Sequence, residues 1–179
     1  MIVSGPSGVG KSTICKAVVK QLENVHLSIS ATTRPKSANE IDGRDYWFLS
    51  EQDFKEQLEK DGFLEHAEVF GHCYGTPKPK VEEALEAGQT VILEIDVQGA
   101  MQAKTFYPDA VMIFILPPTE RDLAERMSRR GRDDSDAAEE RLEGASDEIA
   151  AAWQHYKHMI INDNLEQAVG ECTQIIRDA

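Results

Sequence analysis

The sequence predicts an α/β protein, in which parallel strands form a sheet with helices on both faces. Short apolar runs, typical of buried parallel strands, alternate with amphipathic stretches of helical periodicity. A glycine-rich segment, Gly5–Ser12, joins the first apolar run to the first amphipathic stretch. A continuous apolar run from Val91 to Ile95 ends at the carboxylate Asp96, as expected where a buried strand reaches a functional site.

The segment from 1 to 88 is expected to start with a strand and a helix. After them, strands and helices no longer alternate regularly. A strand at 1–4 precedes a helix with Ile14, Val18 and Leu22 on one face. Ser50, with Asp53 three residues on, predicts a helix amino terminus. The other expected elements are a strand at 25–29, a polar loop at 30–39, a strand at 46–49, two strands within 63–74 that meet at Gly71, and a helix that begins near Pro77 and Pro79 and ends at Gly88.

The segment from 89 to 179 keeps the alternation of strands and helices. Apolar runs predict strands at 91–96, 111–116 and 159–161. Helices are expected from about Gln98, from Thr119 with Asp122, from Ser135, and from Asn164 with Gln167. We therefore expect one domain, with a core made of 1–29 and 89–179 and a small lobe, 30–88, inserted between them.

Composition restricts the classes of partner. A net charge of −13 argues against a general nucleic-acid binder, which presents a basic face to phosphates. No apolar run is long enough to cross a bilayer, and the first residues lack the pattern of a signal peptide. Cys15, Cys73 and Cys172 are too far apart to suggest a disulfide framework or a zinc site. We expect a cytoplasmic protein that binds no nucleic acid and no membrane; its oligomeric state is left open.

The glycine-rich segment is a complete phosphate-binding loop. Its residues, Gly5-Pro6-Ser7-Gly8-Val9-Gly10-Lys11-Ser12, match G-x-x-x-x-G-K-[ST] at every fixed position. In such a loop successive N–H groups point at an anion, and the following helix adds its positive end. Lys11 can reach the β- and γ-phosphates, and the Ser12 hydroxyl can ligate Mg²⁺. The motif predicts a nucleoside triphosphate site that uses Mg²⁺.

Further short motifs occur along the chain in a fixed order. They are Thr32-Thr33-Arg34 with Glu40, Gly43, Tyr46 and Phe48; Phe63–Glu68; Tyr74-Gly75-Thr76; Ile95–Gly99; Ile115–Pro118; Arg130-Gly131; Arg141-Leu142; and Ile161-Asn162-Asp163. In this combination the chain resembles the guanylate kinase family over nearly its whole length. The resemblance implies a single P-loop kinase domain over 1–179, with a GMP-binding lobe at 30–88 and an arginine-bearing lid at about 126–141. It also implies transfer of the γ-phosphoryl group of ATP to GMP, giving ADP and GDP, with dGMP as a further candidate acceptor.

The resemblance implies a role for each site residue. Guanine presents N–H donors on its base edge, so its binding site needs acceptors, and Glu65 and Asp96 match the family's carboxylates. Hydroxyl donors and the phosphate clamp are matched by Ser30, Thr76, Arg34, Tyr46 and Tyr74. Besides Gly5–Ser12, the ATP site is expected to include Thr13, and Asn162 near the adenine. Catalysis is expected from Lys11, Arg34, Arg130 and Arg141, because phosphoryl transfer needs charge neutralisation more than covalent chemistry.

Several alternatives stay open on the sequence alone. Without the resemblance, Tyr46 fits a packing position as well as a ligand contact, and Glu65 and Glu68 fit a solvated face. Ser37 stands where the family has a second Arg or Lys, which predicts weakened GMP affinity. The nearby cations Lys36 and Arg44 are candidates to compensate. The alternative functions are a guanylate-kinase-like nucleotide-binding module with impaired catalysis and a P-loop kinase for another small phosphorylated acceptor.

Overall fold

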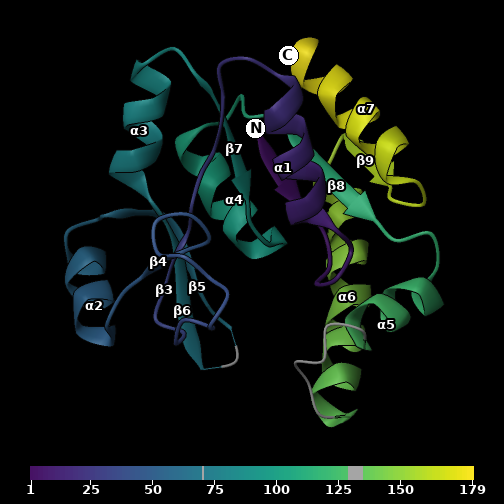
Figure 1. The fold of residues 1–179 in the computed structure, drawn as a ribbon, viewed down its shortest axis with the longest axis horizontal. Helices are drawn as coiled ribbons and strands as arrows, with labels where there is room; N and C mark the ends of the chain where they lie inside the picture. The colour runs from purple at the N-terminus through teal and green to yellow at the C-terminus, as the bar shows by residue number, and fades with distance from the viewer. Residues whose placement is uncertain (70, 129–134) are drawn as a thin grey trace. The chain divides into compact units, whose positions relative to one another are not determined.

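The computed structural model describes residues 1–69, 71–128 and 135–179, with the backbone alone described for 135–143. The chain forms two compact units (Figure 1). The first comprises Met1–Glu23, Glu94–Val97 and Ala110–Ala179, and the second comprises Asn24–Leu93 and Gln98–Asp109. The chain passes from the second unit to the first within strand β7 (Thr90–Glu94).

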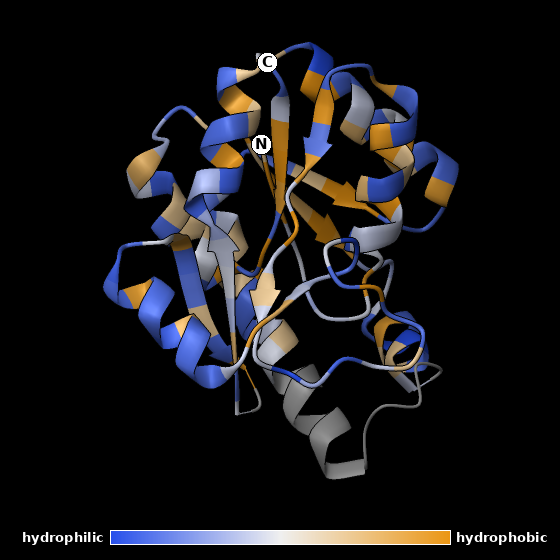
Figure 2. Ribbon diagram, turned by 60° about the vertical axis from the view of Figure 1, so that its left-hand side comes forward, coloured by the Kyte–Doolittle hydropathy of each residue, from blue (hydrophilic) through white to orange (hydrophobic). Residues whose placement is uncertain are grey.

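Parallel strands form the centre of the first unit. β1 (Ile2–Ser4) pairs with β8 (Met112–Leu116), and β8 pairs with β9 (His158–Ile161). Figure 2 shows these strands in hydrophobic colours, whereas the helices alternate between hydrophobic and hydrophilic stretches. Val3, Ile113 and Phe114 are fully buried. Because both faces of such strands are covered, their sequence reads as a continuous apolar run.

Among the described residues of the first unit, the helices are α1 (Lys11–Gln21), α5 (Glu120–Ser128), α6 (Ser135–His155) and α7 (Leu165–Arg177). α1 and α7 lie side by side (Figure 1). Helix caps fix two of the starting points. The Asn164 side chain accepts a hydrogen bond from the Gln167 amide at 3.0 Å, and Thr119 accepts one from the Asp122 amide at 3.1 Å.

The second unit contains a mixed sheet in the order β4-β3-β6-β5. Its strands are β3 (Ala31–Thr32), β4 (Trp47–Phe48), β5 (Phe63–Val69) and β6 (His72–Pro77). β3 and β4 are parallel, and the other pairs are antiparallel. Here too β2 (Val25–Leu27) runs parallel to β7. The helices are α2 (Glu51–Glu59), α3 (Lys78–Glu86) and most of α4 (Val97–Phe106).

The predicted α/β class is confirmed, with parallel strands flanked by helices. The predicted starts at Ser50 and Asn164 are confirmed by their capping hydrogen bonds. The predicted loop at 30–39 is wrong at residues 31 and 32, because Ala31 and Thr32 form β3 and pair with β6 and β4. A two-residue strand is too short to show periodicity, so only its long-range pairing defines it. No described helix is long and apolar enough to span a membrane.

Candidate functional site

The phosphate-binding loop connects β1 to α1 in the first unit. Gly5 and Gly10 have φ angles of 148° and 106°, which residues with a Cβ rarely adopt. A Cβ on Gly5 would collide with the carbonyl oxygen of Ile115, and one on Gly10 would lie 2.5 Å from the Asn162 side-chain nitrogen. The loop therefore depends on these glycines for both backbone conformation and space. It ends at the amino terminus of an 11-residue helix, whose positive end favours an anion.

Lys11 closes the loop on itself. Its ammonium group donates hydrogen bonds to the carbonyl oxygens of Gly5 and Pro6, the latter at 3.1 Å. Burial lowers the pKa of Lys11, while the nearby carboxylates of Glu94 and Glu148 act in the opposite direction. The ammonium is thus held within the loop, where it can exchange carbonyl partners for phosphate oxygens.

Ser12 is joined to a carboxylate that our sequence analysis left out of the site. The Ser12 hydroxyl donates to Glu94 Oε1 at 2.5 Å, and Glu94 is the last residue of β7. A phosphate-loop hydroxyl and a carboxylate at the end of a neighbouring strand are the oxygen ligands that hold Mg²⁺ in P-loop proteins. The donor set therefore fits Mg²⁺. The signal in the sequence is Glu94 itself, a carboxylate inside the apolar run from Val91 to Ile95.

A second carboxylate that we did not predict is Glu148, on α6. Its Oε2 atom is buried and has no hydrogen-bond partner among the described residues. Burial raises the pKa of Glu148 to about 7, with Lys11 opposing the rise and Asp96 adding to it. The residue lies in a helix rich in Ala and Glu, where the sequence offers nothing to set it apart.

The burial of Glu148 is expected to make the free energy of unfolding depend on pH. The folded state holds the Glu148 proton up to about pH 7, whereas an unfolded chain releases it near the ordinary value of 4.5. The stabilisation of the folded state by the protonated Glu148 carboxyl group is therefore complete below pH 4.5 and is lost as the pH rises through 7. Glu148→Gln, which cannot ionise, should gain about 1–3 kcal/mol over the wild type between pH 5 and pH 8. Urea unfolding at both pH values measures this difference.

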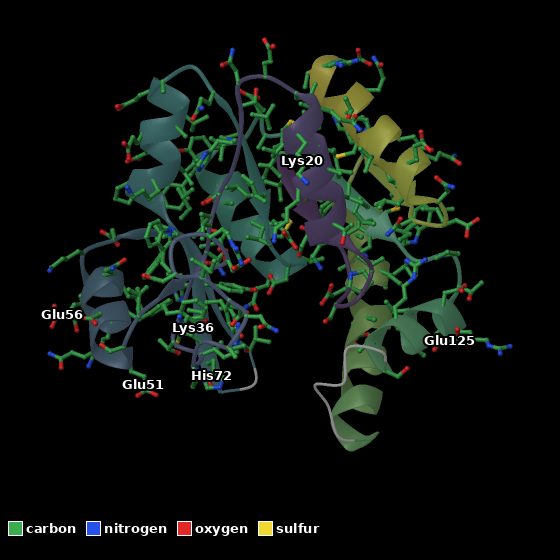
Figure 3. All side chains as sticks on the ribbon, in the orientation of Figure 1. Lys20, Lys36, Glu51, Glu56, His72 and Glu125 are labelled. Carbon is green, nitrogen blue, oxygen red and sulfur yellow. The ribbon has the colours of Figure 1, made fainter. Side chains whose placement is uncertain are left out.

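The control for this prediction is Glu125→Gln, because Glu125 is an exposed carboxylate of the same unit (Figure 3) that pairs with Arg121 at 3.2 Å. Its difference from the wild type should stay nearly constant between the two pH values. A constant difference for Glu148→Gln as well would show that its carboxyl group has an ordinary pKa.

Asn162 and Arg126 brace the phosphate loop at Val9. The Asn162 side-chain amide donates to the Val9 carbonyl oxygen at 2.7 Å. Arg126 donates to the Asn162 carbonyl oxygen at 2.9 Å and to that of Val9 at 3.4 Å. Asn162 was predicted as an ATP-site residue, and its side chain contacts the loop itself. Arg126 stands at the start of the segment expected to form the lid, and its contact with Val9 spans 117 positions of sequence, which local patterns cannot predict.

In the second unit, Glu65 and Thr76 form a buried pair. The Thr76 hydroxyl donates to Glu65 Oε1 at 2.6 Å. Thr76 is 1% exposed and Glu65 is 6% exposed. The other carboxylate oxygen, Oε2, lies 2.5 Å from where a Cβ of Gly99 would stand. Glu68, three residues along β5, is exposed. A solvated face is therefore the wrong interpretation for Glu65, and a buried carboxylate needs such partners because its desolvation is costly.

The predicted phosphate clamp is also brought together in this unit. The Arg34 guanidinium lies 5.5 Å from the centre of the Tyr46 ring, and the Tyr46 and Tyr74 rings are 6.0 Å apart. The hydrogen bond to Glu40 raises the pKa of Arg34, and the Tyr74 hydroxyl contributes in the same direction. A positive charge framed by two phenols is a suitable place for a phosphate group.

The structure gives less detail on the surroundings of the remaining predicted site residues. Ser30 is half-buried, and its carbonyl oxygen accepts from the Trp47 amide at 2.9 Å. Asp96 follows β7 in the first unit, where its carbonyl oxygen accepts from the Ser4 hydroxyl at 3.5 Å. Thr13 is exposed on α1. Arg130 and the side chain of Arg141 lie outside what the structure describes.

Comparison with known proteins identifies related chains. The family model described as guanylate kinase matches residues 1–179. The guanylate kinase of Carboxydothermus hydrogenoformans is 48% identical over 177 residues, which cover 98% of this chain and 86% of that protein. The guanylate kinase of Caldanaerobacter subterraneus subsp. tengcongensis is 45% identical over 176 residues, covering 98% and 85%. The crystal structure of guanylate kinase from Anaplasma phagocytophilum superposes with a TM-score of 0.81 at 31% identity, covering 99% of this chain and 83% of that one.

Proposed function

Because the chain belongs to the guanylate kinase family, we propose that it transfers the γ-phosphoryl group of ATP to GMP, giving ADP and GDP. Family membership makes it a nucleoside monophosphate kinase. The choice of GMP rests above all on the buried Glu65–Thr76 pair, which offers a carboxylate acceptor inside the second unit. Guanine carries N–H donors on its base edge, and a buried acceptor favours the base that satisfies it.

The first unit supplies the donor half of the reaction in this proposal. The loop N–H groups and Lys11 bind the β- and γ-phosphates of ATP. Ser12 and Glu94 are the side chains that would hold Mg²⁺, which would neutralise charge on these phosphates when bound with ATP. Asn162 and Arg126 keep the loop in the shape that this binding requires, because both hydrogen-bond to the Val9 carbonyl oxygen.

The second unit binds most of the acceptor. Glu65 accepts from the guanine N–H groups, and the hydroxyls of Thr76 and Ser30 add polar contacts. Asp96 is the second carboxylate that we assign to the base. Arg34, Tyr46 and Tyr74 bind the phosphate of GMP, which fixes its oxygen for attack on the γ-phosphorus. Positioning of this kind converts a bimolecular step into an effectively unimolecular one.

Arg130 and Arg141 are proposed to complete the site from a lid at about 126–141. Two guanidinium groups would stabilise the negative charge on the oxygens of the transferred group. Closure of such a lid would also exclude water, so that ATP is not hydrolysed. We further propose a cytoplasmic location, where both nucleotides are available.

The test is ADP release with ATP, Mg²⁺ and a panel of acceptors: GMP, dGMP, AMP, CMP, UMP and ribose phosphates. We expect turnover with GMP, or with GMP and dGMP, and no more than background with the others. Turnover with a different acceptor alone would refute the assignment of Glu65 and Asp96 to guanine. ATP binding without turnover on any acceptor would instead support a binding module with impaired catalysis.

A further inference from the structure

The segment between β3 and β4 closes around the Arg34 guanidinium. Arg34 Nη2 donates to Glu40 Oε1 at 2.7 Å, and the second oxygen of the same carboxylate, Oε2, accepts from the Ser37 backbone amide at 2.8 Å. Arg34 Nη1 donates to the Pro35 carbonyl oxygen at 2.9 Å and to Ser37 Oγ at 3.3 Å. The Glu40 carboxylate thus binds both the Arg34 side chain and the Ser37 backbone amide.

This bonded group is partly withdrawn from water. The Arg34 and Glu40 side chains are 22% and 14% exposed, and the guanidinium faces the rings of Tyr46 at 5.5 Å and Phe48 at 5.9 Å. The hydrogen bond from Arg34 lowers the pKa of Glu40. Charge-assisted hydrogen bonds in such surroundings are stronger than those of an exposed ion pair. The guanidinium therefore has one preferred orientation.

Ser37 gives this segment a feature of its own. Where the family places a second Arg or Lys, this chain has a hydroxyl that accepts a hydrogen bond from Arg34. The two nearby cations do not fill the gap in the same way. Arg44 pairs with Asp45 at 2.6 Å, and Lys36 is exposed (Figure 3). Arg34 is the cation that lies against the Tyr46 ring, so the orientation of its guanidinium matters for a phosphate bound there.

We propose that Glu40 is a positioning residue for the phosphate group of the acceptor nucleotide, which it serves by fixing the Arg34 guanidinium. The proposal rests on the function proposed above. A guanidinium has five N–H donors. The segment takes three of them through Glu40, Pro35 and Ser37. It holds the group against the Tyr46 ring, 5.5 Å from its centre, and the Tyr74 side chain also hydrogen-bonds to Arg34. A long side chain held in this way loses less rotamer freedom when the phosphate binds.

The test measures GMP binding by calorimetry without ATP, together with steady-state kinetics. Glu40→Gln keeps the size of the side chain but loses the charge and one of its two acceptor oxygens. We expect the Kd and KM for GMP to rise about tenfold to hundredfold, while kcat changes less than about threefold. In an Arg34→Ala background the same substitution should change the Kd less than about twofold, because Glu40 acts through Arg34.

The matched control is Glu56→Gln, an exposed acid on α2 of the same unit (Figure 3), which should leave GMP binding unchanged. If Glu40→Gln does not fold, Glu40→Asp carries the test, because its shorter chain cannot reach both Arg34 and Ser37. Unchanged binding in these variants would overturn the proposal, and tighter binding would show that Glu40 competes with the phosphate. An equal loss in the Arg34→Ala background would also overturn it. A wild-type chain that binds no GMP would refute the proposed function and this inference together.

Discussion

Replacing Lys11 with methionine is expected to lower kcat about a thousandfold or more, with ATP, Mg²⁺ and GMP as substrates. Methionine keeps an unbranched chain but removes the ammonium that lies between the Gly5 and Pro6 carbonyl oxygens. In phosphoryl transfer the protein acts mainly by neutralising charge on the transferred group, so one lost cation removes a large share of the rate enhancement. The measurement is kcat at saturating nucleotide concentrations.

Lys20→Met is the matched control for Lys11→Met, because Lys20 is an exposed lysine of the same helix (Figure 3). It should retain wild-type kcat. GMP binding measured without ATP should survive in Lys11→Met, since the acceptor contacts are assigned to other side chains. Retention of more than about a tenth of the wild-type rate in Lys11→Met would contradict the role assigned to the phosphate loop.

Replacing Glu65 with glutamine is expected to lower kcat/KM for GMP about a hundredfold or more. The amide keeps one acceptor oxygen and turns the other end into a donor, which would face the guanine N–H groups. Thr76 already donates to Oε1 at 2.6 Å, so the acceptor that remains is partly occupied. Discrimination between GMP and AMP should shrink by a similar factor. Parallel kinetics with both acceptors measure it.

Glu68→Gln controls for the loss of a carboxylate from the same strand. Glu68 is exposed on β5, whereas Glu65 is 6% exposed. The control should change kcat/KM for GMP less than about twofold, since exposed substitutions away from a site have small effects. The KM for ATP should stay close to the wild-type value in both variants. If Glu65→Gln still prefers GMP over AMP as strongly as the wild type does, residues other than Glu65 recognise the base.

The elements that sequence predicted well are those with local signals. Ser50 and Asn164 are side chains that cap the helix beginning one residue later, so their neighbours in sequence are also their partners. The apolar run of β8 is buried from Met112 to Ile115, which gives a pattern that can be recognised without knowledge of the strand's partner. β3 is the opposite case, because its two residues are defined only by pairing with strands that follow later in the chain.

The candidate site shows the same division. The Glu65–Thr76 pair and the Arg34 clamp contain residues that the family resemblance had named, and the structure adds which atoms meet. The sequence marks Glu40 only as a position that matches the family pattern, and its hydrogen bonds to Arg34 and Ser37 are the basis for the role proposed for it. Ser37 was noted as a missing charge, and it is in fact an acceptor for Arg34.

By itself the sequence determined the α/β class, the phosphate loop and membership of the guanylate kinase family, because each depends on residue order over short stretches. Only the tertiary structure joined Ser12 to Glu94, Val9 to Arg126, and Glu148 to the surroundings of Lys11. The first two contacts connect positions 82 and 117 residues apart. The hydrogen-bond partner of a buried polar group is a residue that the fold brings close to it. Such a residue can be far away in the sequence, where no periodic pattern marks it.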